Sequence, residues 1–222
     1  MKRTVIIIGA TGGIGKVLYE QYAFGKNPAI LDSIVVRGVS RGAPFFIDIT
    51  NPKDCDDFAY VMEDYTNLQV INCAGINYNA TIERSEYDKW RDVIETNLIG
   101  SYNLLKAFTP IMKEQGYGRF VFMSSIAEKG LYGASAYAAS KAGLEGLVKS
   151  AAKELLKYNI TVNALRLGYF NTGLIRDVPN SKVEELSTAG EMCAPTGLFD
   201  VIEGVFKCGD MTGSIINVDR GV

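Results

Sequence analysis

Short apolar runs alternate with longer helical patterns along this chain, and this alternation restricts the possible folds more than any other feature. The apolar runs that predict strands lie at 4–9, 33–39, 68–75, 118–125, 160–167 and 213–219. The helical patterns between them lie near 13–24, 51–65, 86–114 and 135–157. Most of the apolar runs are almost continuous, as is typical of parallel strands that are covered on both faces. We therefore predict the α/β class, with a doubly wound parallel sheet flanked by helices on both faces.

Size and composition narrow the class of protein further. The chain has 222 residues, 47% of them hydrophobic, which is enough for one sizeable core, so we predict a single domain over 1–222. The net charge is −2 and the basic residues are scattered, so nucleic acid is not an expected partner. No apolar stretch approaches the roughly 18 residues of a membrane span, and four widely spaced cysteines are typical of free thiols in a reducing cytoplasm. Because the chain has no histidine, His-based triads and most zinc sites are excluded, and we expect no metal.

A glycine-rich turn follows the first apolar run and opens onto a helical pattern. It reads GATGGIG over 9–15. Glycine lets the backbone turn sharply there and lets a pyrophosphate approach the helix N-terminus. No Gly-Lys-Ser/Thr ending follows, so a P-loop is disfavoured. We predict a Rossmann-type dinucleotide site formed by Gly9, Thr11, Gly12, Gly13, Ile14 and Gly15.

The end of the second predicted strand indicates which nicotinamide cofactor is bound. A carboxylate there would bond a ribose 2′-hydroxyl, whereas a guanidinium matches a 2′-phosphate. Ser40 and Arg41 stand at this strand end, while Asp32 precedes the strand and belongs to its opposite end. We therefore predict NADP(H), with Ser40 and Arg41 at its phosphate. The alternative is that Arg41 is a solvated surface residue.

Three Tyr/Lys pairs share the i, i+4 spacing that places both side chains on one helix face. They are Tyr22/Lys26, Tyr102/Lys106 and Tyr137/Lys141. Gly25 would end the first helix before Lys26, and Tyr102 is expected to pack while Lys106 is solvated. Only Tyr137 begins a helix shortly after a strand that ends in two serines, and ligands bind outside the carboxyl ends of parallel strands. The third pair is therefore the expected catalytic one.

Eight motifs in register give the chain a resemblance to the short-chain dehydrogenase/reductase family, and in pattern to its 3-oxoacyl-acyl-carrier-protein reductase-like members. The motifs extend over nearly the full length of the chain. They are GATGGIG (9–15), DIT (48–50), NCAG (72–75), Asn97 in ETNLIG, SSIA (124–127), YAASK (137–141), NALRLGYFNT (163–172) and TGSIINVDRG (212–221).

The resemblance implies a role for each matching residue. Tyr137 would be the general acid that protonates a carbonyl oxygen, and Lys141 would lower the pKa of its phenol and hold the nicotinamide ribose. Ser125 would position the substrate oxygen, and Asn97 would anchor a water that leads protons to the lysine. The other cofactor contacts implied by the resemblance are Asp48, Ile49, Asn72, Ala74, Gly75, Gly168, Tyr169 and Thr172.

The chain also departs from the family pattern. Cys73 replaces the second asparagine of the usual motif. The interval from Ser125 to Tyr137 is one residue shorter than usual, so Ser124 stays an alternative for the catalytic serine. Residues 171–197 are polar, contain two prolines, and are predicted to form a small mobile lid over the substrate.

The function implied by the resemblance is NADPH-dependent reduction of a ketone to a secondary alcohol. The expected substrate is a 3-oxoacyl thioester on acyl carrier protein or CoA, in fatty acid or polyketide biosynthesis. Two alternatives stay open: a dehydrogenase of a sugar or another secondary alcohol, and a non-catalytic NADP-binding regulator or scaffold. The resemblance also implies a cytoplasmic homodimer or homotetramer, with acyl carrier protein as a candidate partner.

Overall fold

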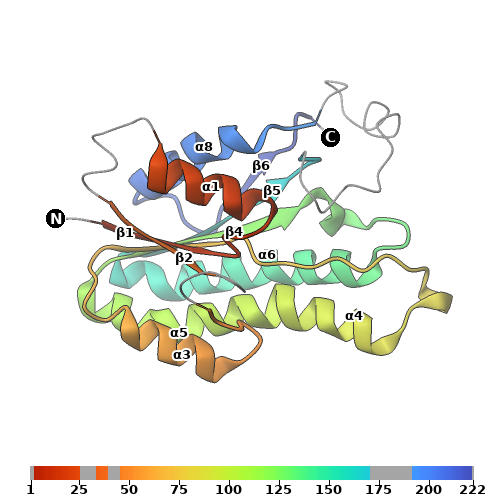
Figure 1. Cartoon of the computed structure of the whole chain (residues 1–222), viewed down its shortest axis with the longest axis horizontal. Coiled ribbons are helices and arrows are strands. Elements are labelled where there is room, and N and C mark those ends of the chain that lie inside the picture. Colours follow the sequence, from red (N-terminus) through yellow and green to blue (C-terminus); the bar gives the residue numbers. More distant parts are fainter. Residues whose placement is uncertain (1–2, 26–33, 40–45, 171–191, 222) are drawn as a thin grey trace.

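The computed structural model describes residues 3–25, 34–39, 46–170 and 192–221, and within them the strands form one six-stranded parallel sheet (Figure 1). The strands are β1 (Arg3–Ile8), β2 (Ile34–Val39), β3 (Leu68–Asn72), β4 (Gly118–Ser125), β5 (Ile160–Leu167) and β6 (Ile215–Val218). In the order β2-β1-β3-β4-β5-β6, strand β2 lies on one side of β1, and β3 to β6 follow one another on the other side. After β2 the chain therefore crosses over β1 to form β3. The six predicted strands are confirmed. The crossing leaves a switch point between β1 and β3, where doubly wound sheets bind their ligands.

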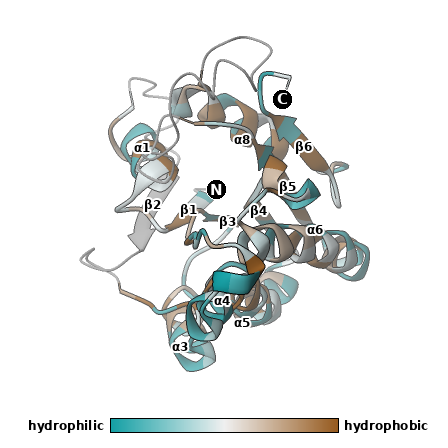
Figure 2. Cartoon of the chain, turned by 90° about the vertical axis from the view of Figure 1, so that its right-hand side faces the viewer, coloured by the Kyte–Doolittle hydropathy of each residue, from teal (hydrophilic) through white to brown (hydrophobic). Residues whose placement is uncertain are grey.

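Helices cover both faces of this sheet, which explains why its strands are apolar throughout. Helices α1 (Gly13–Phe24) and α8 (Leu198–Lys207) lie on one face, and α3 (Pro52–Val61), α5 (Gly100–Gln115) and α6 (Ser135–Leu155) lie on the other (Figures 1 and 2). Successive residues of β1 alternate between the two cores: Val5 and Ile7 pack toward α1 and α8, and Ile6 and Ile8 pack toward the other helices. The predicted architecture is thus confirmed.

Local signals account for the bounds of the predicted helices. Asn51 caps α3, since its side-chain oxygen accepts a hydrogen bond from the main-chain N–H of Lys53 at 3.0 Å, and Pro52 occupies the first helical position. Helix α1 stops at Phe24, with Gly25 as its C-cap. Helix α5 ends at Gly116, which adopts the left-handed conformation (φ 63°) favoured by glycine.

The helical pattern predicted over 86–114 is divided in the structure. Helix α4 (Tyr87–Ile94) continues into a π-helical turn, Glu95–Ile99, before α5 begins. Asn97 lies in the middle of this turn and is buried. Such π-helical turns inside longer helices are frequent at functional sites.

Helix α8 was not among the predicted helices. Its buried residues Leu198, Ile202, Val205 and Phe206 follow the i, i+4, i+7, i+8 period of an amphipathic helix, and that signal could have revealed it. Within the described part of the chain, no helix is both long and apolar enough to span a bilayer.

The predicted lid falls mostly outside the described residues, which exclude 171–191. Its final part is packed rather than extended into solvent. The main-chain N–H of Cys193 donates a 2.7 Å hydrogen bond to the main-chain oxygen of Tyr169, and Cys193 is buried. A short 3₁₀ turn at Pro195–Gly197 then leads into α8.

Candidate active site

The turn between β1 and α1 depends on glycine for two steric reasons. Gly9 has φ 80°, and a Cβ on it would lie 2.8 Å from the main-chain nitrogen of Ala74. Gly13 also has a positive φ, of 47°. A Cβ on Gly15 would lie 2.3 Å from the Gly9 oxygen. These three glycines are therefore explained by the fold itself.

Gly12 is different, because neither its conformation nor its packing requires glycine. Its backbone is extended (φ −129°, ψ 151°), and no atom of the described residues lies within 4 Å of a Cβ built on it. Thr11, Gly12 and Gly13 are exposed, Ile14 is half-buried, and no side chain in the described part of the chain caps the N-terminus of α1. An open cradle beside uncapped main-chain N–H groups fits a pyrophosphate.

The switch point beside this turn is lined by the end of β3. Asn72 pairs with Ile8 across the sheet, and its side-chain oxygen accepts a hydrogen bond from the main-chain N–H of Ala74 at 3.0 Å. Its amide nitrogen donates to the hydroxyl of Ser101 on α5 at 3.1 Å. Asn72 therefore shapes the segment that carries Ala74 and Gly75, rather than presenting its own amide to a ligand.

The adenine side of the predicted cofactor site is only partly described. Val39, the last residue of β2, pairs with Ile8, so the chain leaves β2 at the same edge as the glycine turn. Ser40 and Arg41 follow Val39 but lie outside the described residues. The carboxylate of Asp48 accepts hydrogen bonds from both the main chain and the hydroxyl of Thr50, at 3.0 and 2.7 Å.

The side chain of Ile49 faces away from this site. It is buried, and it packs so tightly under α5 that a Cβ on Gly100 would lie 2.7 Å from it. Any contact of Ile49 with a nucleotide is therefore limited to its main chain.

The structure places the three Tyr/Lys pairs in different surroundings. The Tyr22 hydroxyl is buried and donates a 2.8 Å hydrogen bond to Glu203 on α8, while Lys26 lies outside the described residues. Tyr102 was expected to pack, and this expectation is wrong: its side chain is 47% exposed, because α5 turns Ser101, Leu104 and Leu105 inward instead. Neither tyrosine faces the carboxyl edge of the sheet.

Tyr137 faces the serine at the end of β4. Its phenol lies close enough to the Ser125 side chain for that neighbour to lower the pKa of the phenol. The Ser125 Oγ also accepts a hydrogen bond from the main-chain N–H of Ala127 at 3.2 Å, and so caps the 3₁₀ turn Ile126–Lys129. Gly130 and Gly133 have positive φ angles (101° and 74°), which carry the chain back to α6 within the shortened interval.

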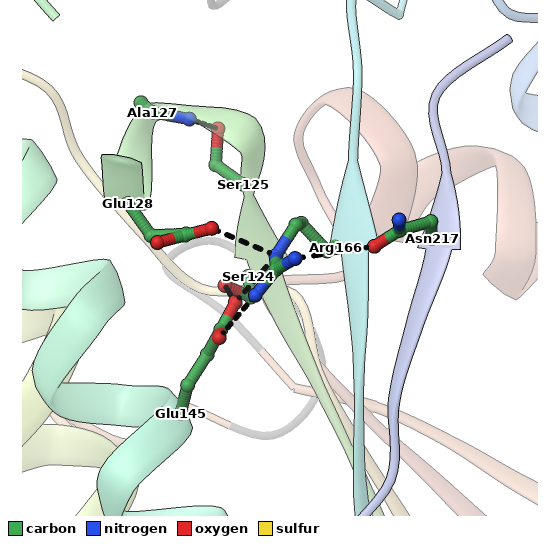
Figure 3. Close-up of polar contacts among 7 residues, drawn as sticks. All are labelled: Ser124, Ser125, Ala127, Glu128, Glu145, Arg166 and Asn217. Carbon is green, nitrogen blue, oxygen red and sulfur yellow. Dashed lines mark hydrogen bonds and ion pairs between the residues drawn. The ribbon is translucent and has the colours of Figure 1, made fainter. Parts of the chain in front are cut away.

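The two candidate serines have different partners. The Ser124 side chain is buried and donates a 2.8 Å hydrogen bond to Glu145, which lies about two turns beyond Tyr137 on α6 (Figure 3). Adjacent residues of a strand point in opposite directions. Ser125, the last residue of β4, is the serine that lies beside the Tyr137 phenol.

Lys141 is buried one helical turn beyond Tyr137. Its Nζ donates a 2.7 Å hydrogen bond to the main-chain oxygen of Met123 and lies 5.3 Å from the centre of the Tyr137 ring. Burial lowers the pKa of Lys141 to about 8, and the neighbouring Cys73 opposes this shift. A Cβ on Gly75 would lie 3.7 Å from Nζ, so the ammonium borders the switch point.

The pKa of Tyr137 moves in the opposite direction to the one expected. Burial raises the pKa of the phenol, and the neighbouring Ser125 side chain only partly lowers it again. A depression by Lys141 was expected, but the net shift of the pKa is upward, because loss of hydration is the largest effect on this phenol. The phenol is held in its protonated form, as a proton donor requires.

Asn97 connects the switch point with the helix of Tyr137. Its side-chain amide makes two 2.9 Å hydrogen bonds with the main chain of Ile76, one accepted and one donated. It also donates to the Ser140 hydroxyl at 3.0 Å, and this hydroxyl in turn donates to the main-chain carbonyl oxygen of Tyr137 at 2.7 Å. Sequence reasoning missed Ser140, although its place three residues after Tyr137 on one helix could have suggested a supporting contact.

The segments that follow β5 and β6 complete the carboxyl edge of the sheet. The main-chain N–H of Gly168 donates to the Val218 oxygen at 3.1 Å, and a Cβ on Gly168 would lie 2.7 Å from the Cα of Asp219. Tyr169 is half-buried, and burial raises the pKa of its phenol. Thr172 lies outside the described residues.

Comparison with known proteins places this geometry among oxidoreductases. Residues 3–182 match the family model described as short chain dehydrogenase. The chain is 31% identical over 246 aligned positions to the 3-oxoacyl-acyl-carrier-protein reductase FabG of Staphylococcus aureus, covering 100% of this chain and 98% of that protein. It is also 31% identical over 240 positions to the acetoacetyl-CoA reductase of Rhizobium meliloti, with the same coverage.

Two solved structures share the fold. The aldohexose dehydrogenase of Thermoplasma acidophilum aligns with a TM-score of 0.85 at 25% identity, covering 99% of this chain and 93% of that one. A variant of actinorhodin polyketide ketoreductase, solved with NADPH, aligns with a TM-score of 0.87 at 22% identity, covering 99% and 96%. The second likeness shows the fold alone.

Proposed function

Since the chain belongs to the short-chain dehydrogenase family, whose members bind a nicotinamide cofactor, we propose that it is an NADPH-dependent reductase of ketones. The proposal rests above all on one observation. Tyr137, Ser125 and Lys141 converge at the carboxyl end of β4, beside the switch point that Gly75 borders. We also propose that the whole chain acts as one catalytic domain.

Tyr137 and Ser125 are the two groups that would act on the substrate carbonyl. The Tyr137 phenol lies beside the Ser125 side chain, so a carbonyl oxygen placed between the two hydroxyls would accept from both. The bound cofactor would supply the hydride to the carbonyl carbon. Ser125 then orients the oxygen, and Tyr137 gives it the proton as negative charge develops there.

Lys141 would serve the same step from one turn away. Its ammonium is fixed on the Met123 oxygen, which leaves its other N–H donors directed at the region of Gly75. A ribose bound at the switch point would accept from these donors. Loss of the tyrosine proton leaves a phenolate, which the nearby positive charge stabilises until the proton is replaced.

The glycine turn would hold the cofactor phosphates, and β2 would select its ribose. Gly12 and the uncapped N-terminus of α1 fit the pyrophosphate. We propose that Arg41, two residues beyond the end of β2, binds a 2′-phosphate and makes NADP(H) the preferred cofactor.

A 3-oxoacyl thioester is the substrate that we favour. Two curated relatives that match the entire chain are named as reductases of such thioesters, one on acyl carrier protein and one on CoA. The test is an NADPH-oxidation screen of the purified protein with acetoacetyl-CoA and acetoacetyl-acyl-carrier-protein, beside free ketones that lack the thioester. Turnover of free ketones alone would exclude a carrier-bound substrate.

A sugar or another secondary alcohol is the second candidate. It is supported by the likeness to an aldohexose dehydrogenase over 99% of this chain. Reduction of NADP⁺ by aldohexoses, without NADPH oxidation by thioesters, would favour it. A non-catalytic regulator is the third candidate, and cofactor binding without turnover of any carbonyl would support it.

We further propose that the protein works in the cytoplasm as a homodimer or homotetramer. Ile99 and Tyr102, at the start of α5, are 40% and 47% exposed, and a second copy that packs on this helix would cover them. Light scattering gives the assembly state directly.

A further inference from the structure

Helix α6 contacts the end of β4 through three successive turns. Tyr137, Lys141 and Glu145 are spaced four residues apart, so they share one helix face. Tyr137 lies beside Ser125, while Lys141 is hydrogen-bonded to the Met123 main chain and Glu145 to Ser124. Three consecutive strand residues thus each face one of three successive helical turns. Glu145, on the third of these turns, has no role in the proposed reaction.

Glu145 is a buried carboxylate with a matched cation. Its side chain is 5% exposed, and its two oxygens accept from Nε and Nη2 of Arg166 at 2.9 and 2.6 Å (Figure 3). The Ser124 hydroxyl shares the first of these oxygens. Burial alone would raise the pKa of Glu145, but the hydrogen bonds from Arg166 and Ser124 hold it below its ordinary value. The carboxylate is therefore charged and bidentately paired.

Arg166 extends this pairing around the catalytic strand end. It lies on β5 directly opposite Ser124 in the sheet register. Its Nε is 3.1 Å from the carboxylate of Glu128, and its Nη1 donates to Asn217 on β6 at 3.4 Å (Figure 3). Glu128 belongs to the 3₁₀ turn that Ser125 caps. The guanidinium of Arg166 is thus linked to the segment before Ser125 through Glu145 and Ser124, and to the turn after Ser125 directly through Glu128.

We propose that Glu145 and Arg166 are positioning residues, which act through Ser124 and Glu128 to hold the Ser125 hydroxyl against Tyr137. This inference rests on the proposed function. An ordinary buried ion pair would stabilise α6 against β5 without involving the strand end. The Ser124 hydroxyl is the link between the ion pair and the strand, so its removal separates the two roles.

The decisive variant is Ser124→Ala, which removes that link and leaves the ion pair intact. We expect kcat per NADPH-binding site to fall about tenfold, because a small displacement of a catalytic group is costly. The KM for the carbonyl substrate should change little, and the number of NADPH-binding sites per chain should not change. A larger primary deuterium isotope effect, measured with NADPH deuterated at the transferred position, would show that the reacting step is the one slowed.

A matched control removes a buried hydroxyl elsewhere in the sheet. Thr161 on β5 is 1% exposed, and its Oγ1 has no hydrogen-bond partner among the described residues. It pairs with Arg119 near the start of β4, at the opposite end of these strands from Ser124. Thr161→Ala should keep the wild-type kcat per site. If Ser124→Ala stays within about twofold of the wild type in this quantity, the positioning role is overturned.

A second variant guards against loss of folding in the first. Glu145→Gln keeps an oxygen that can accept from Ser124 but removes the charge that pairs with Arg166, and it should also lower kcat per site at unchanged site number. Tyr137→Phe in the same assay separates a failure of the proposed function from a failure of the positioning role. Turnover by Tyr137→Phe would overturn the proposed function, whereas an inactive Tyr137→Phe beside fully active Ser124→Ala and Glu145→Gln overturns the positioning role alone.

Discussion

Lys141 donates a 2.7 Å hydrogen bond to the main-chain oxygen of Met123, so the lysine one turn beyond the candidate proton donor is fastened to strand β4. Among the described residues this bond satisfies one of the three ammonium donors, and Lys141 is 5% exposed, so water is largely excluded. The position of the ammonium is thereby fixed at some cost in hydration. This cost has a measurable consequence for stability.

The first prediction concerns the pH dependence of stability. The pKa of Lys141 is about 8 in the folded protein, against 10.5 ordinarily. Between these values the unfolded chain binds more protons, so this residue makes the folded protein more stable as pH rises. Lys141→Met removes the effect. Its gain in unfolding free energy over the wild type should be largest near neutral pH and shrink by about 1 kcal/mol between about pH 8 and pH 9.

Urea unfolding of both proteins across this pH range measures the difference. Burial raises the pKa of the Cys73 thiol to about 12, which weakens the fold at high pH in both proteins alike and cancels on subtraction. A difference that stays constant with pH would contradict the lowered pKa of Lys141.

The second prediction separates proton donation from binding. Tyr137→Phe removes only the phenolic hydroxyl, which is the proposed proton donor, so NADPH should bind with near wild-type affinity, while kcat falls by about 100-fold or more. Fluorescence titration of NADPH and steady-state turnover give the two quantities. Tyr102→Phe is the matched control, because Tyr102 is an exposed residue of α5 and its loss should leave turnover unchanged. Near wild-type turnover by Tyr137→Phe would rule out the mechanism.

The third prediction distinguishes glycines required by the fold from the one required by a ligand. Gly12→Ala meets nothing within 4 Å, so the melting temperature should be unchanged while NADPH affinity falls about tenfold or more. Gly9→Ala should lower stability by about 2 kcal/mol or more, because φ is 80° and the new Cβ would lie 2.8 Å from Ala74. Unchanged NADPH affinity in Gly12→Ala would mean that no phosphate approaches this turn.

The fourth prediction concerns the choice of cofactor. Arg41→Asp replaces the cation that we propose for the 2′-phosphate with a carboxylate suited to a 2′-hydroxyl. The ratio of kcat/KM for NADPH to that for NADH should fall at least about tenfold. Parallel assays with the two cofactors measure it, and an unaltered ratio would remove Arg41 from the site.

Much of the fold was predictable because its strands, helix caps and turns depend on residues that are adjacent in the sequence. Continuous apolar runs identified the strands, since a strand covered on both faces needs apolar residues at every position. The Asn51–Pro52 cap and the glycine turn are likewise read from adjacent residues. Helix α8 carried an equally local signal that was overlooked. The π-helical turn around Asn97 has no such signature and was found only in the structure.

The sequence by itself determined most of the secondary structure, the glycine turn and the family, because these depend on the order and spacing of neighbouring residues. Only the tertiary structure decided which residues meet. Three Tyr/Lys pairs look alike in the sequence, and Ser124 and Ser125 are adjacent, yet only Ser125 reaches Tyr137 while Ser124 binds Glu145. The difference arises because neighbouring strand residues point in opposite directions, and the packing of α6, from a distant part of the chain, brings a different helical turn beside each serine.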